Sequence, residues 1–403
     1  MDRQPIVIAG AGLSGAVLAR QLAEAGHAVT IYEQRDHIAG NCYTERDAQT
    51  GVLVHRYGPH IFHTSDREVW DYVTGFTTFR PYYHRVRTTL GGTVFPMPVT
   101  LKTINQFFAM NMTPQQAEAF VTAQAEPIED PQTFEEQALS MIGRPLYEAF
   151  FEGYTQKQWG RPARDLPASI LKRLPLRFTA EDGYFNHAYQ GMPEDGYTPL
   201  VAAILDHPDI TVHLSTPCNP AAVSPDAHLF WSGPLDAYFG HALGRLGYRT
   251  LEFTHSRQSG DFQGIAVMNY GDVDVPYTRI TEHKHFAPWE DHAQTVVTHE
   301  VAAACGPDDI PYYPIRLVHE KALLSQYVAT ANAVSNVTFV GRLGTYRYLD
   351  MDVCIREALD TAAAYLQAQE KQQVLPAFVA QAMLPDVALR VAPQGSPEGG
   401  ARA

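Results

Sequence analysis

Hydrophobic positions near the start of the chain follow the pattern of a strand, a helix and a second strand. Residues 5–9 form a short apolar run, residues 14–25 repeat apolar side chains at helical spacing up to Gly26, and residues 28–32 form another apolar run. Two short apolar runs separated by a glycine-rich turn and a helix are typical of a β-α-β unit with parallel strands. The sequence therefore predicts that the chain opens with such a unit.

Helical periodicity with capping residues marks the next part of the chain. Thr133 stands three residues before Glu136, which is the spacing of a capping box, and Thr113 precedes Pro114, a favoured first helical residue. We also expect a hairpin just before most of these helices, with its turn at Gly91-Gly92 and its strands at 82–90 and 93–98. The expected helices cover residues 65–75, 100–109, 113–126, 133–142 and 144–157.

From about residue 210 the pattern changes to short apolar and β-branched runs bounded by Gly, Pro and Asp. Such a succession predicts an antiparallel sheet. A final helix, strand and helix resemble the opening unit, and we expect them to return to it. The expected strands are 210–214, 228–231, 249–255, 264–270, 277–283 and 295–300, and the closing elements are 319–332, 337–341 and 350–368.

Charge and cysteine usage narrow the classes of function. The 403 residues include 30 Lys and Arg against 44 Asp and Glu, and the resulting charge of −14 makes nucleic acid a poor candidate partner. No stretch is apolar enough for a membrane span and no secretory signal precedes the first strand, so we expect a cytoplasmic protein. The four cysteines are scattered without metal-ligand spacing, which predicts reduced thiols and no metal site.

The turn after the first strand is a GxGxxG motif in a context suited to dinucleotide binding. Its residues are Gly10-Ala11-Gly12-Leu13-Ser14-Gly15, and the glycines allow the main chain to approach a pyrophosphate at a helix N-terminus. Glu33 follows the second strand at the spacing of an acid that binds a ribose 2′-OH, which argues against a 2′-phosphate. We therefore predict a dinucleotide site here.

Two further segments favour FAD over NAD. Residues 35–41 begin soon after Glu33, where flavoproteins place a second glycine turn near the pyrophosphate or ribityl chain. Residues 337–342 lead to a helix that begins near Asp350-Met351, and its N-terminus would favour negative charge on a reduced flavin. From spacing alone, an ordinary crossover fits this second segment equally well.

Several segments taken together resemble the bacterial UDP-galactopyranose mutase family. They occur in the family's order and extend the resemblance from residue 5 to about residue 360. They are Tyr57–Thr64, Gly153–Gly160, Lys172–Thr179, Tyr184–Asn186, Tyr189–Gly191, Val275–Ile280, Glu282–Phe286, Pro311–Pro314 and Gly341–Tyr348.

The resemblance implies an enzyme that interconverts UDP-galactopyranose and UDP-galactofuranose with reduced FAD. In the family's mechanism, flavin N5 attacks the anomeric carbon, UDP leaves, and the ring recloses from an N5–sugar adduct. The implied partners are a UDP-sugar, a reductant such as NAD(P)H and, in the helical region, a second copy in a homodimer. The implied pathway is cell-surface polysaccharide biosynthesis that uses galactofuranose.

The resemblance also assigns roles to single residues. Expulsion of UDP builds negative charge on the β-phosphate, so cations must face it, and guanidinium groups suit this role. The implied catalytic residues are Arg173, Arg279, His60 and His63. The implied substrate-binding residues are Phe150, Tyr154, Trp159, Tyr184, Asn269, Tyr313 and Tyr348. The implied cofactor-binding residues are Gly10, Gly12, Ser14, Gly15, Glu33, Gln34, Asn41, His60, Ile61, Arg249, Arg342, Asp350 and Met351.

The predicted fold class is α/β, with a Rossmann-type FAD-binding domain, an inserted helical domain and an antiparallel β-sheet domain. We expect a mobile lid at about 160–173, whose closure would bring Arg173 onto the phosphates, and a disordered tail at 391–403. The Arg173→Ala variant is expected to keep FAD but lose most turnover. The expected domain ranges are 1–81, 195–247 and 315–390 for FAD, 99–180 for the helical domain, and 82–98, 181–194 and 248–314 for the sheet.

Departures from the family pattern leave the sugar open. Ala39 stands where the family has a glycine, and its methyl group would be tolerated if the backbone is not at positive φ. Residues 315–317 and 234–241 also depart from the pattern, and Arg56 adds a cation. A mutase of UDP-N-acetylgalactosamine or of a deoxyhexose nucleotide is therefore an alternative. An amine-oxidase-like FAD oxidoreductase and a flavin-containing binding protein without turnover are the others.

Overall fold

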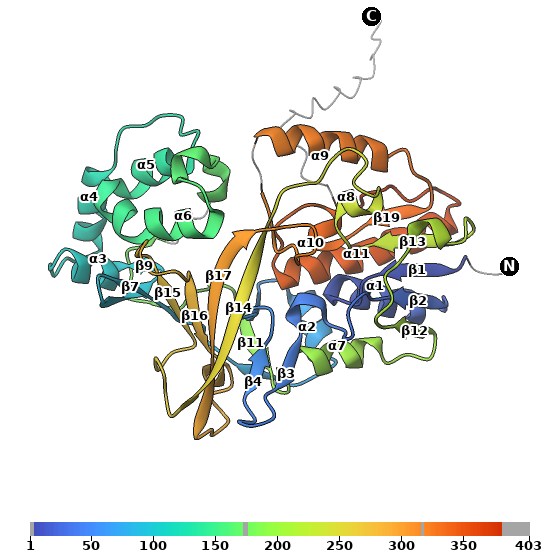
Figure 1. Cartoon of the computed structure of the whole chain (residues 1–403), viewed down its shortest axis with the longest axis horizontal. Coiled ribbons are helices and arrows are strands. Elements are labelled where there is room, and N and C mark those ends of the chain that lie inside the picture. Colours follow the sequence, from blue (N-terminus) through green and yellow to red (C-terminus); the bar gives the residue numbers. More distant parts are fainter. Residues whose placement is uncertain (1–3, 172–175, 316–317, 381–403) are drawn as a thin grey trace, which may run out of the picture.

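The computed structural model describes residues 4–171, 176–315 and 318–380. Figure 1 shows helices α3 to α6 at one end of the molecule and a parallel sheet with α1 and α11 at the other. The long strands β14 and β17 lie between these two parts (Figure 1). The α/β fold class expected from the sequence is confirmed.

The parallel sheet has the strand order β12-β2-β1-β13-β19. β1 pairs in parallel with both β2 and β13, and is therefore central. The helix α1 (Leu13–Glu24) packs against α7 (Tyr197–Leu205) and α11 (Met351–Glu370), so the opening β-α-β unit lies in the main apolar core. The strands are β1 (Ile6–Ala9), β2 (Val29–Tyr32), β12 (Ile210–His213), β13 (His228–Trp231) and β19 (Val337–Phe339).

Two strands of this sheet correct the sequence prediction. The short apolar runs at 210–214 and 228–231 predicted antiparallel strands, although both lie in the range 195–247 expected for the FAD-binding domain. In the structure β12 and β13 pair in parallel with β2 and β1. Their short apolar runs look alike in either kind of sheet, so the pattern did not identify the partner strand. β13 is buried along its whole length, as is typical of a central parallel strand.

The second large sheet has the order β18-β14-β17-β16-β15-β7-β8. Its neighbours are antiparallel except for β15 and β7, which are parallel. The predicted hairpin is confirmed, since Leu90 pairs with Thr93 across Gly91-Gly92. The strands are β7 (Val86–Leu90), β8 (Thr93–Met97), β14 (Tyr248–Ser259), β15 (Val267–Tyr270), β16 (Arg279–Glu282), β17 (Gln294–Ala304) and β18 (Tyr313–Pro314).

The helical group begins where its capping residues predict. Thr113 and Thr133 both form capping boxes, at α4 and at α5. Gly143 departs from helical geometry within α5, at the junction between the two helices expected at 133–142 and 144–157. The elements are α3 (Leu101–Phe107), α4 (Pro114–Gln124), α5 (Phe134–Tyr147), a π-helical turn (Glu148–Glu152) and α6 (Gly153–Trp159).

Short elements connect these parts. A three-stranded sheet has the order β5-β11-β6, and two-stranded pairs are formed by β3 with β4 and by β9 with β10. The domain ranges given above stay a prediction, and the tail at 391–403 lies outside the described residues. The short elements are β3 (Thr44–Arg46), β4 (Leu53–His55), β5 (Phe62–Thr64), β6 (Phe79–Pro81), β9 (Val99–Thr100), β10 (Leu176–Arg177), β11 (Tyr189–Pro193), α2 (Arg67–Thr74), α8 (Leu235–Tyr238), α9 (Val318–Ala331) and α10 (Gly341–Gly344).

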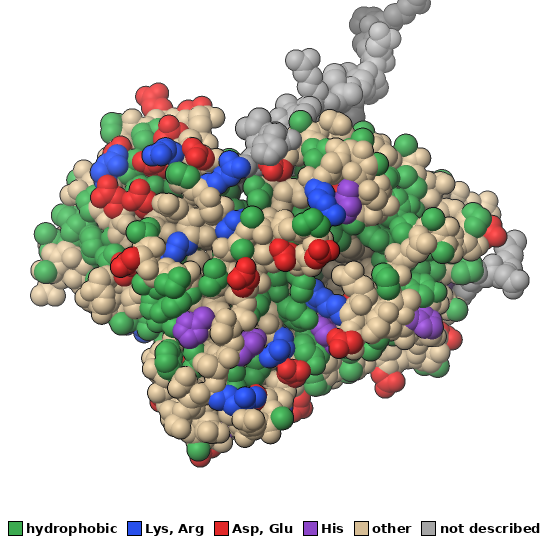
Figure 2. Space-filling model, viewed as in Figure 1, with side chains coloured by type: hydrophobic (Ala, Val, Ile, Leu, Met, Phe, Trp, Pro, Cys, Tyr) green, Lys and Arg blue, Asp and Glu red, His purple; other side chains and the backbone are tan. Residues whose placement is uncertain are grey.

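The surface carries both signs of charge. On the face shown in Figure 2, Lys and Arg side chains are interspersed with Asp and Glu. Within the described part of the chain, no helix combines the length and apolar character that a bilayer crossing needs.

Candidate active site

A cavity of about 790 Å³ lies beside the glycine-rich turn, where residues that follow β1, β2, β13 and β19 meet. The carboxyl ends of parallel strands are the usual place for a dinucleotide in such sheets. Many of the coenzyme residues predicted from the sequence line this cavity: Gly10, Gly12, Ser14, Gly15, Glu33, Gln34, Asn41, His60, Arg342 and Met351.

The glycine-rich turn has the geometry that a pyrophosphate needs. A Cβ at Gly15 would lie 2.0 Å from the Gly10 carbonyl oxygen, so only glycine lets the helix begin this close to the turn. Gly12 caps α1 without a side-chain hydrogen bond, which leaves the first N–H groups of the helix to face an anion. The buried Glu33 carboxylate accepts from the amides of Ala11 at 2.8 Å and Arg35 at 2.9 Å, and so fixes the turn against β2.

Ala39 shows a backbone conformation that the sequence did not reveal. Its φ is 71°, which is positive, so its methyl group strains the backbone. An L-residue in the left-handed region costs about 1–2 kcal/mol. The conformation is held by burial, with 1% of the residue exposed, and by a 2.9 Å hydrogen bond from its amide to the Ala11 carbonyl.

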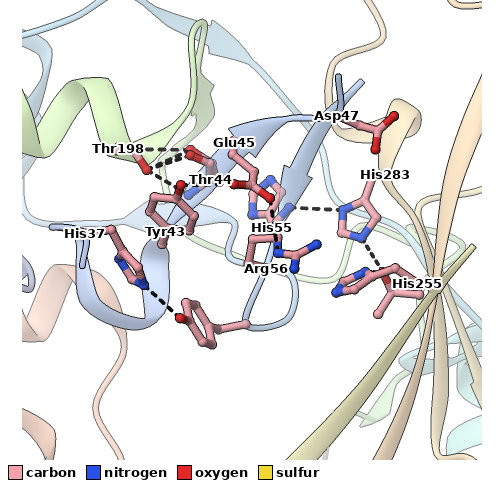
Figure 3. Close-up of polar contacts among 12 residues, drawn as sticks. His37, Tyr43, Thr44, Glu45, Asp47, His55, Arg56, Thr198, His255 and His283 are labelled. Carbon is pink, nitrogen blue, oxygen red and sulfur yellow. Dashed lines mark hydrogen bonds and ion pairs between the residues drawn. The ribbon is translucent and has the colours of Figure 1, made fainter. Parts of the chain in front are cut away.

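Arg35 is a cavity residue that the sequence analysis treated only as part of a turn. Its Nη2 donates to Asn41 Oδ1 at 2.8 Å, and its guanidinium lies 4.6 Å from the centroid of the Tyr57 ring. The Tyr57 hydroxyl contacts Nε2 of His37 at 2.7 Å (Figure 3). Nη1 is buried without a hydrogen-bond partner among the described residues, which points to an acceptor group on a ligand.

His60 lines the cavity with a tautomer that its contacts determine. Its Nδ1 lies 2.9 Å from the Gly58 carbonyl, which can only accept, so the proton is on Nδ1 and Nε2 is an acceptor. Burial first, and then the Arg342 charge, lower the pKa of His60 to about 4, so the ring is neutral at neutral pH. The His60 amide donates to Nδ1 of His55 at 3.3 Å, and the His55 amide donates to Nδ1 of His283 (Figure 3).

His63 is not among the residues that line the cavity. Its Nδ1 lies 2.9 Å from Nδ1 of His187, so one ring donates a hydrogen bond that the other accepts. The His63 ring also stacks on Phe185, with 3.6 Å between ring centroids. Burial lowers the pKa of His63, which favours the neutral form. Its catalytic role stays a prediction.

A second polar cluster surrounds Arg279, at the start of β16. Its Nη2 donates to the Tyr154 hydroxyl and its Nε donates to Asn269 Oδ1, both at 3.3 Å. Burial alone would lower the pKa of Arg279, but the attraction of Glu300, Tyr154 and neighbouring tyrosines raises it well above the usual value. Arg279 therefore stays charged, and three residues predicted to bind substrate or catalyse lie within hydrogen-bonding reach of one another.

Glu300 on β17 is a member of this cluster that the sequence analysis missed. Its carboxylate is 3.6 Å from Arg279 Nη1 and only 2% of the residue is exposed. Neither carboxylate oxygen has a hydrogen bond among the described residues. A Cβ built on Gly58 would lie 3.7 Å from Oε2, so this carboxylate also faces the turn that carries His60. Its strand position is ordinary in sequence, which is why no local motif identified it.

Arg342 links the cavity to the Arg279 cluster through aromatic rings. Its guanidinium lies 4.7 Å from the centroid of the Tyr348 ring, and its Nη2 donates to the Leu349 carbonyl at 2.6 Å. The Tyr348 ring in turn lies 5.4 Å from the Tyr313 ring. Tyr348 is 52% exposed and Tyr184 is 37% exposed, so their hydroxyls are available to a ligand. The coenzyme cavity and the predicted phosphate cluster are therefore neighbours.

Other predicted residues have contacts of a different kind. Phe150 packs edge to face on Phe95 and Phe107, each 5.3 Å between centroids, in the core of the helical group. Arg249 donates to the carbonyls of Gln158 and Lys157 at the end of α6, and does not line the cavity. Their assigned roles stay predictions.

The remaining predicted residues lie near the site without lining its cavity, or outside the described residues. Ile61 is buried directly after His60, and Asp350 caps α11 one residue before Met351. Trp159 ends α6 and is half-buried against the core. Arg173 falls in 172–175, outside the described residues, and its catalytic role stays a prediction.

Comparison with protein families gives two matches that agree with this geometry. A family model described as UDP-galactopyranose mutase matches residues 149–348, which include the Arg279 cluster, Arg342 and Tyr348. A model described as an NAD(P)-binding Rossmann-like domain matches residues 8–76, which include the glycine-rich turn, Glu33 and His60.

Similar proteins cover nearly the whole chain. A probable UDP-galactopyranose mutase of Klebsiella pneumoniae is 55% identical over 379 residues, which are 94% of this chain and 99% of the relative. A dTDP-fucopyranose mutase of Escherichia coli is 47% identical over 370 residues, 90% of this chain and 98% of the relative. A UDP-galactopyranose mutase of Mycoplasma pneumoniae is 32% identical, covering 90% of this chain and 96% of the relative.

Solved structures share the fold. The crystal structure of a reduced UDP-galactopyranose mutase superposes with a TM-score of 0.71 at 16% identity, covering 91% of this chain and 96% of that one. A putrescine oxidase superposes with a TM-score of 0.55 at 12% identity, covering 90% of this chain and 99% of that one. At such identities the likeness shows the fold alone.

The family matches and the full-length relatives together identify an isomerase, and the family and fold imply a flavin coenzyme. The residues around the cavity fit a flavin dinucleotide, because a glycine-rich turn at a helix N-terminus, the Glu33 carboxylate, an Arg35 nitrogen without a partner among the described residues and the half-buried Arg342 all face one space. The chain thus belongs to the UDP-galactopyranose mutase family.

Proposed function

We propose that this enzyme interconverts UDP-galactopyranose and UDP-galactofuranose with FAD as its coenzyme, in the reduced form. The observation that carries the proposal is the junction of two sites. The cavity residue Arg342 stacks on Tyr348, and Tyr348 and Tyr313 lie near enough to Arg279 for electrostatic interaction, while Glu300 faces the Gly58–His60 turn on the other side. A diphosphate held at Arg279 would therefore place its sugar next to a coenzyme held in the cavity.

We assign FAD binding to the residues that line the cavity. The first turn of α1 would hold the pyrophosphate and Glu33 a ribose hydroxyl, while Arg35 and Arg342 would supply cationic contacts. Reduced flavin supplies an electron-rich nitrogen able to take up the sugar while UDP departs.

The residues of the Arg279 cluster would hold UDP during departure and return. Arg279 remains charged and would stabilise the negative charge that develops on the β-phosphate. Hydroxyl groups of Tyr184, Tyr313 and Tyr348 would donate to the phosphate oxygens, and the Tyr154 hydroxyl already contacts Arg279. Glu300 limits how firmly Arg279 binds the phosphates, because it attracts the same guanidinium.

His60 would interact with a hydroxyl group of the sugar. Its neutral ring presents Nε2 as an acceptor, so it would accept a hydrogen bond from a sugar hydroxyl as the ring opens and recloses. Closure of the predicted lid at about 160–173 would exclude water at this stage, and Arg173→Ala would then retain FAD but lose most turnover. NAD(P)H as reductant and a homodimer stay part of this proposal.

One observation favours a second candidate substrate. The relative that shares 47% of its residues over 90% of this chain is a dTDP-fucopyranose mutase, so a dTDP-deoxyhexose is the alternative. The same phosphate contacts would serve either nucleotide, since the Arg279 cluster recognises the diphosphate. The choice between them lies in contacts to the base and to the sugar C6 position.

Product analysis tests the proposal directly. The dithionite-reduced, FAD-loaded protein is incubated with UDP-galactopyranose, UDP-N-acetylgalactosamine or dTDP-fucopyranose, and products are separated and weighed by mass spectrometry. We expect a new isomer of unchanged mass from UDP-galactopyranose, formed only by the reduced protein. An oxidised product with oxygen uptake would instead indicate an amine-oxidase type of reaction, and no product from any sugar would refute a mutase.

A further inference from the structure

Lys157 has an unusual set of contacts. It lies on α6 and is half-buried. Its Nζ donates to the main-chain carbonyls of Tyr270 at 2.6 Å, Asp272 at 2.8 Å, Tyr277 at 3.0 Å and Val275 at 3.2 Å. An ammonium group has three protons, so these four carbonyls share them around a compact cation. The Lys157 side chain therefore fixes the conformation of the loop that carries these carbonyls.

The loop that Lys157 holds is the connection between β15 and β16. The two strands bring Asn269 and Arg279 opposite each other in register, and the Tyr270 amide donates to the Thr278 carbonyl at 2.9 Å across the end of the loop. The loop runs straight into Arg279. The conformation of the loop therefore determines where the Arg279 side chain is positioned.

The helix that carries Lys157 also carries substrate residues. Tyr154 lies three residues before Lys157, and its hydroxyl contacts Arg279 at 3.3 Å. Residues three apart in a helix share one face, so Tyr154 and Lys157 both face the β15–β16 hairpin. Trp159 ends the same helix. The ammonium thus joins the two elements that would have to act together on a nucleotide sugar.

A second close contact supports this junction. A Cβ at Gly153 would lie 2.3 Å from the carbonyl oxygen of Gly271, which is closer than any side chain tolerates. The helix and the loop therefore touch backbone to backbone at Gly153, one turn before the Lys157 tie. The contact is independent of the lysine and can be altered separately.

We propose that Lys157 is a positioning residue that fixes α6 and the Arg279 hairpin relative to each other for binding of the uridine nucleotide. The proposal rests on the function proposed above. Loss of the ammonium would release the loop, so Tyr154 and Arg279 would no longer meet the nucleotide together. The contacts between Lys157 and the loop lie outside the coenzyme cavity, since Lys157 and residues 270–277 are not among its lining residues. Loss of the Lys157 ammonium should therefore weaken nucleotide binding and leave flavin binding unchanged.

Calorimetric titration with UDP, alongside flavin content from absorbance, tests this separation. We expect Lys157→Met to weaken UDP binding at least tenfold and raise KM for the nucleotide sugar, with flavin content and flavin spectrum unchanged. Lys157→Arg should restore little, because a planar guanidinium does not fit a ring of carbonyls around a point cation. Lys284→Met is the matched control, since the Lys284 ammonium also donates to a loop carbonyl, that of Gly260 at 2.8 Å, and pairs with Asp261 at 2.6 Å rather than with the β15–β16 loop. It should bind UDP like the wild type.

Gly153→Ala provides a second route if Lys157→Met does not fold. It keeps the ammonium but pushes the loop away, and the same loss of UDP affinity with normal flavin content is expected. UDP binding within twofold of wild type in a folded Lys157→Met or Gly153→Ala protein would overturn the proposal, even if its melting temperature fell. Failure of the wild-type protein and of Lys284→Met to bind UDP would instead overturn the proposed function.

Discussion

The Glu300→Gln variant would remove the negative charge of Glu300 while keeping the shape of its side chain. The carboxylate lies 3.6 Å from Arg279 Nη1 and has no hydrogen bond among the described residues, so the replacement removes mainly one electrostatic attraction. At an effective dielectric constant of about 20, that attraction is about 4–5 kcal/mol. A quarter of the Arg279 side chain is exposed, and screening by water reduces the value to about 2 kcal/mol.

The sign of the effect depends on whether the nucleotide is present. Without UDP, Glu300→Gln should lower the free energy of unfolding by about 2 kcal/mol, because a partly buried guanidinium loses its counter-charge. When UDP is bound to the variant, the diphosphate supplies the negative counter-charge for Arg279, and no carboxylate at position 300 competes with it. UDP affinity should therefore rise about 10–30-fold, since about 1.4 kcal/mol corresponds to a factor of ten.

Thermal unfolding with and without saturating UDP, and calorimetric titration of UDP, measure both effects. Glu252→Gln, on the neighbouring strand β14 and exposed, is the control and should change neither quantity. Equal destabilisation of Glu300→Gln in both conditions, with UDP affinity unchanged or lower, would refute the claim that Glu300 and the diphosphate compete for Arg279.

Three further predictions follow from the coenzyme cavity. Ala39→Val should destabilise the protein by more than about 2 kcal/mol and lower flavin content, because a β-branched residue is strained at φ of 71°, whereas Ala39→Gly should melt close to wild type. Arg342→Lys should weaken flavin binding about tenfold, measured by ultrafiltration, since it loses the stacking on Tyr348 and a fixed hydrogen bond. The pKa of His60 is lowered to about 4 in the folded state, from an unfolded value near 6.5, so the unfolded chain binds more protons between these values. Stability should thus be full above about pH 6.5 and fall as the pH is lowered towards 4, and His60→Asn should show a shallower fall in urea unfolding between these pH values.

The sequence predicted local elements well and spatial partners less well. The opening unit, the caps at Thr113 and Thr133, and the helix start at Met351 depend on neighbouring residues, and all were confirmed. The strands at 210–214 and 228–231 were predicted as antiparallel but are parallel, because the choice of partner strand depends on distant residues.

The same distinction applies to the candidate site. The glycine-rich turn and Glu33 belong to one sequence motif, and in the structure both line the cavity. Glu300 and Arg35 were missed, since a buried carboxylate opposite Arg279 and a cavity-wall nitrogen with no partner in the described part of the chain are properties of the assembled structure. The tolerance of Ala39 was left conditional on its φ angle, which only the structure supplies.

The parallel sheet takes its strands from distant parts of the chain, and this shapes how the protein must be made. β13 pairs with β1 on one side and with β19 on the other, and β19 comes late in the sequence. On the ribosome, the backbone edge of β13 stays unpaired until Val337–Phe339 have emerged, and such delayed non-local pairing slows folding and exposes an aggregation-prone edge. A coenzyme that binds in the cavity would therefore be held only after β19 has paired, because Gly341 and Arg342, which follow this strand, line the cavity.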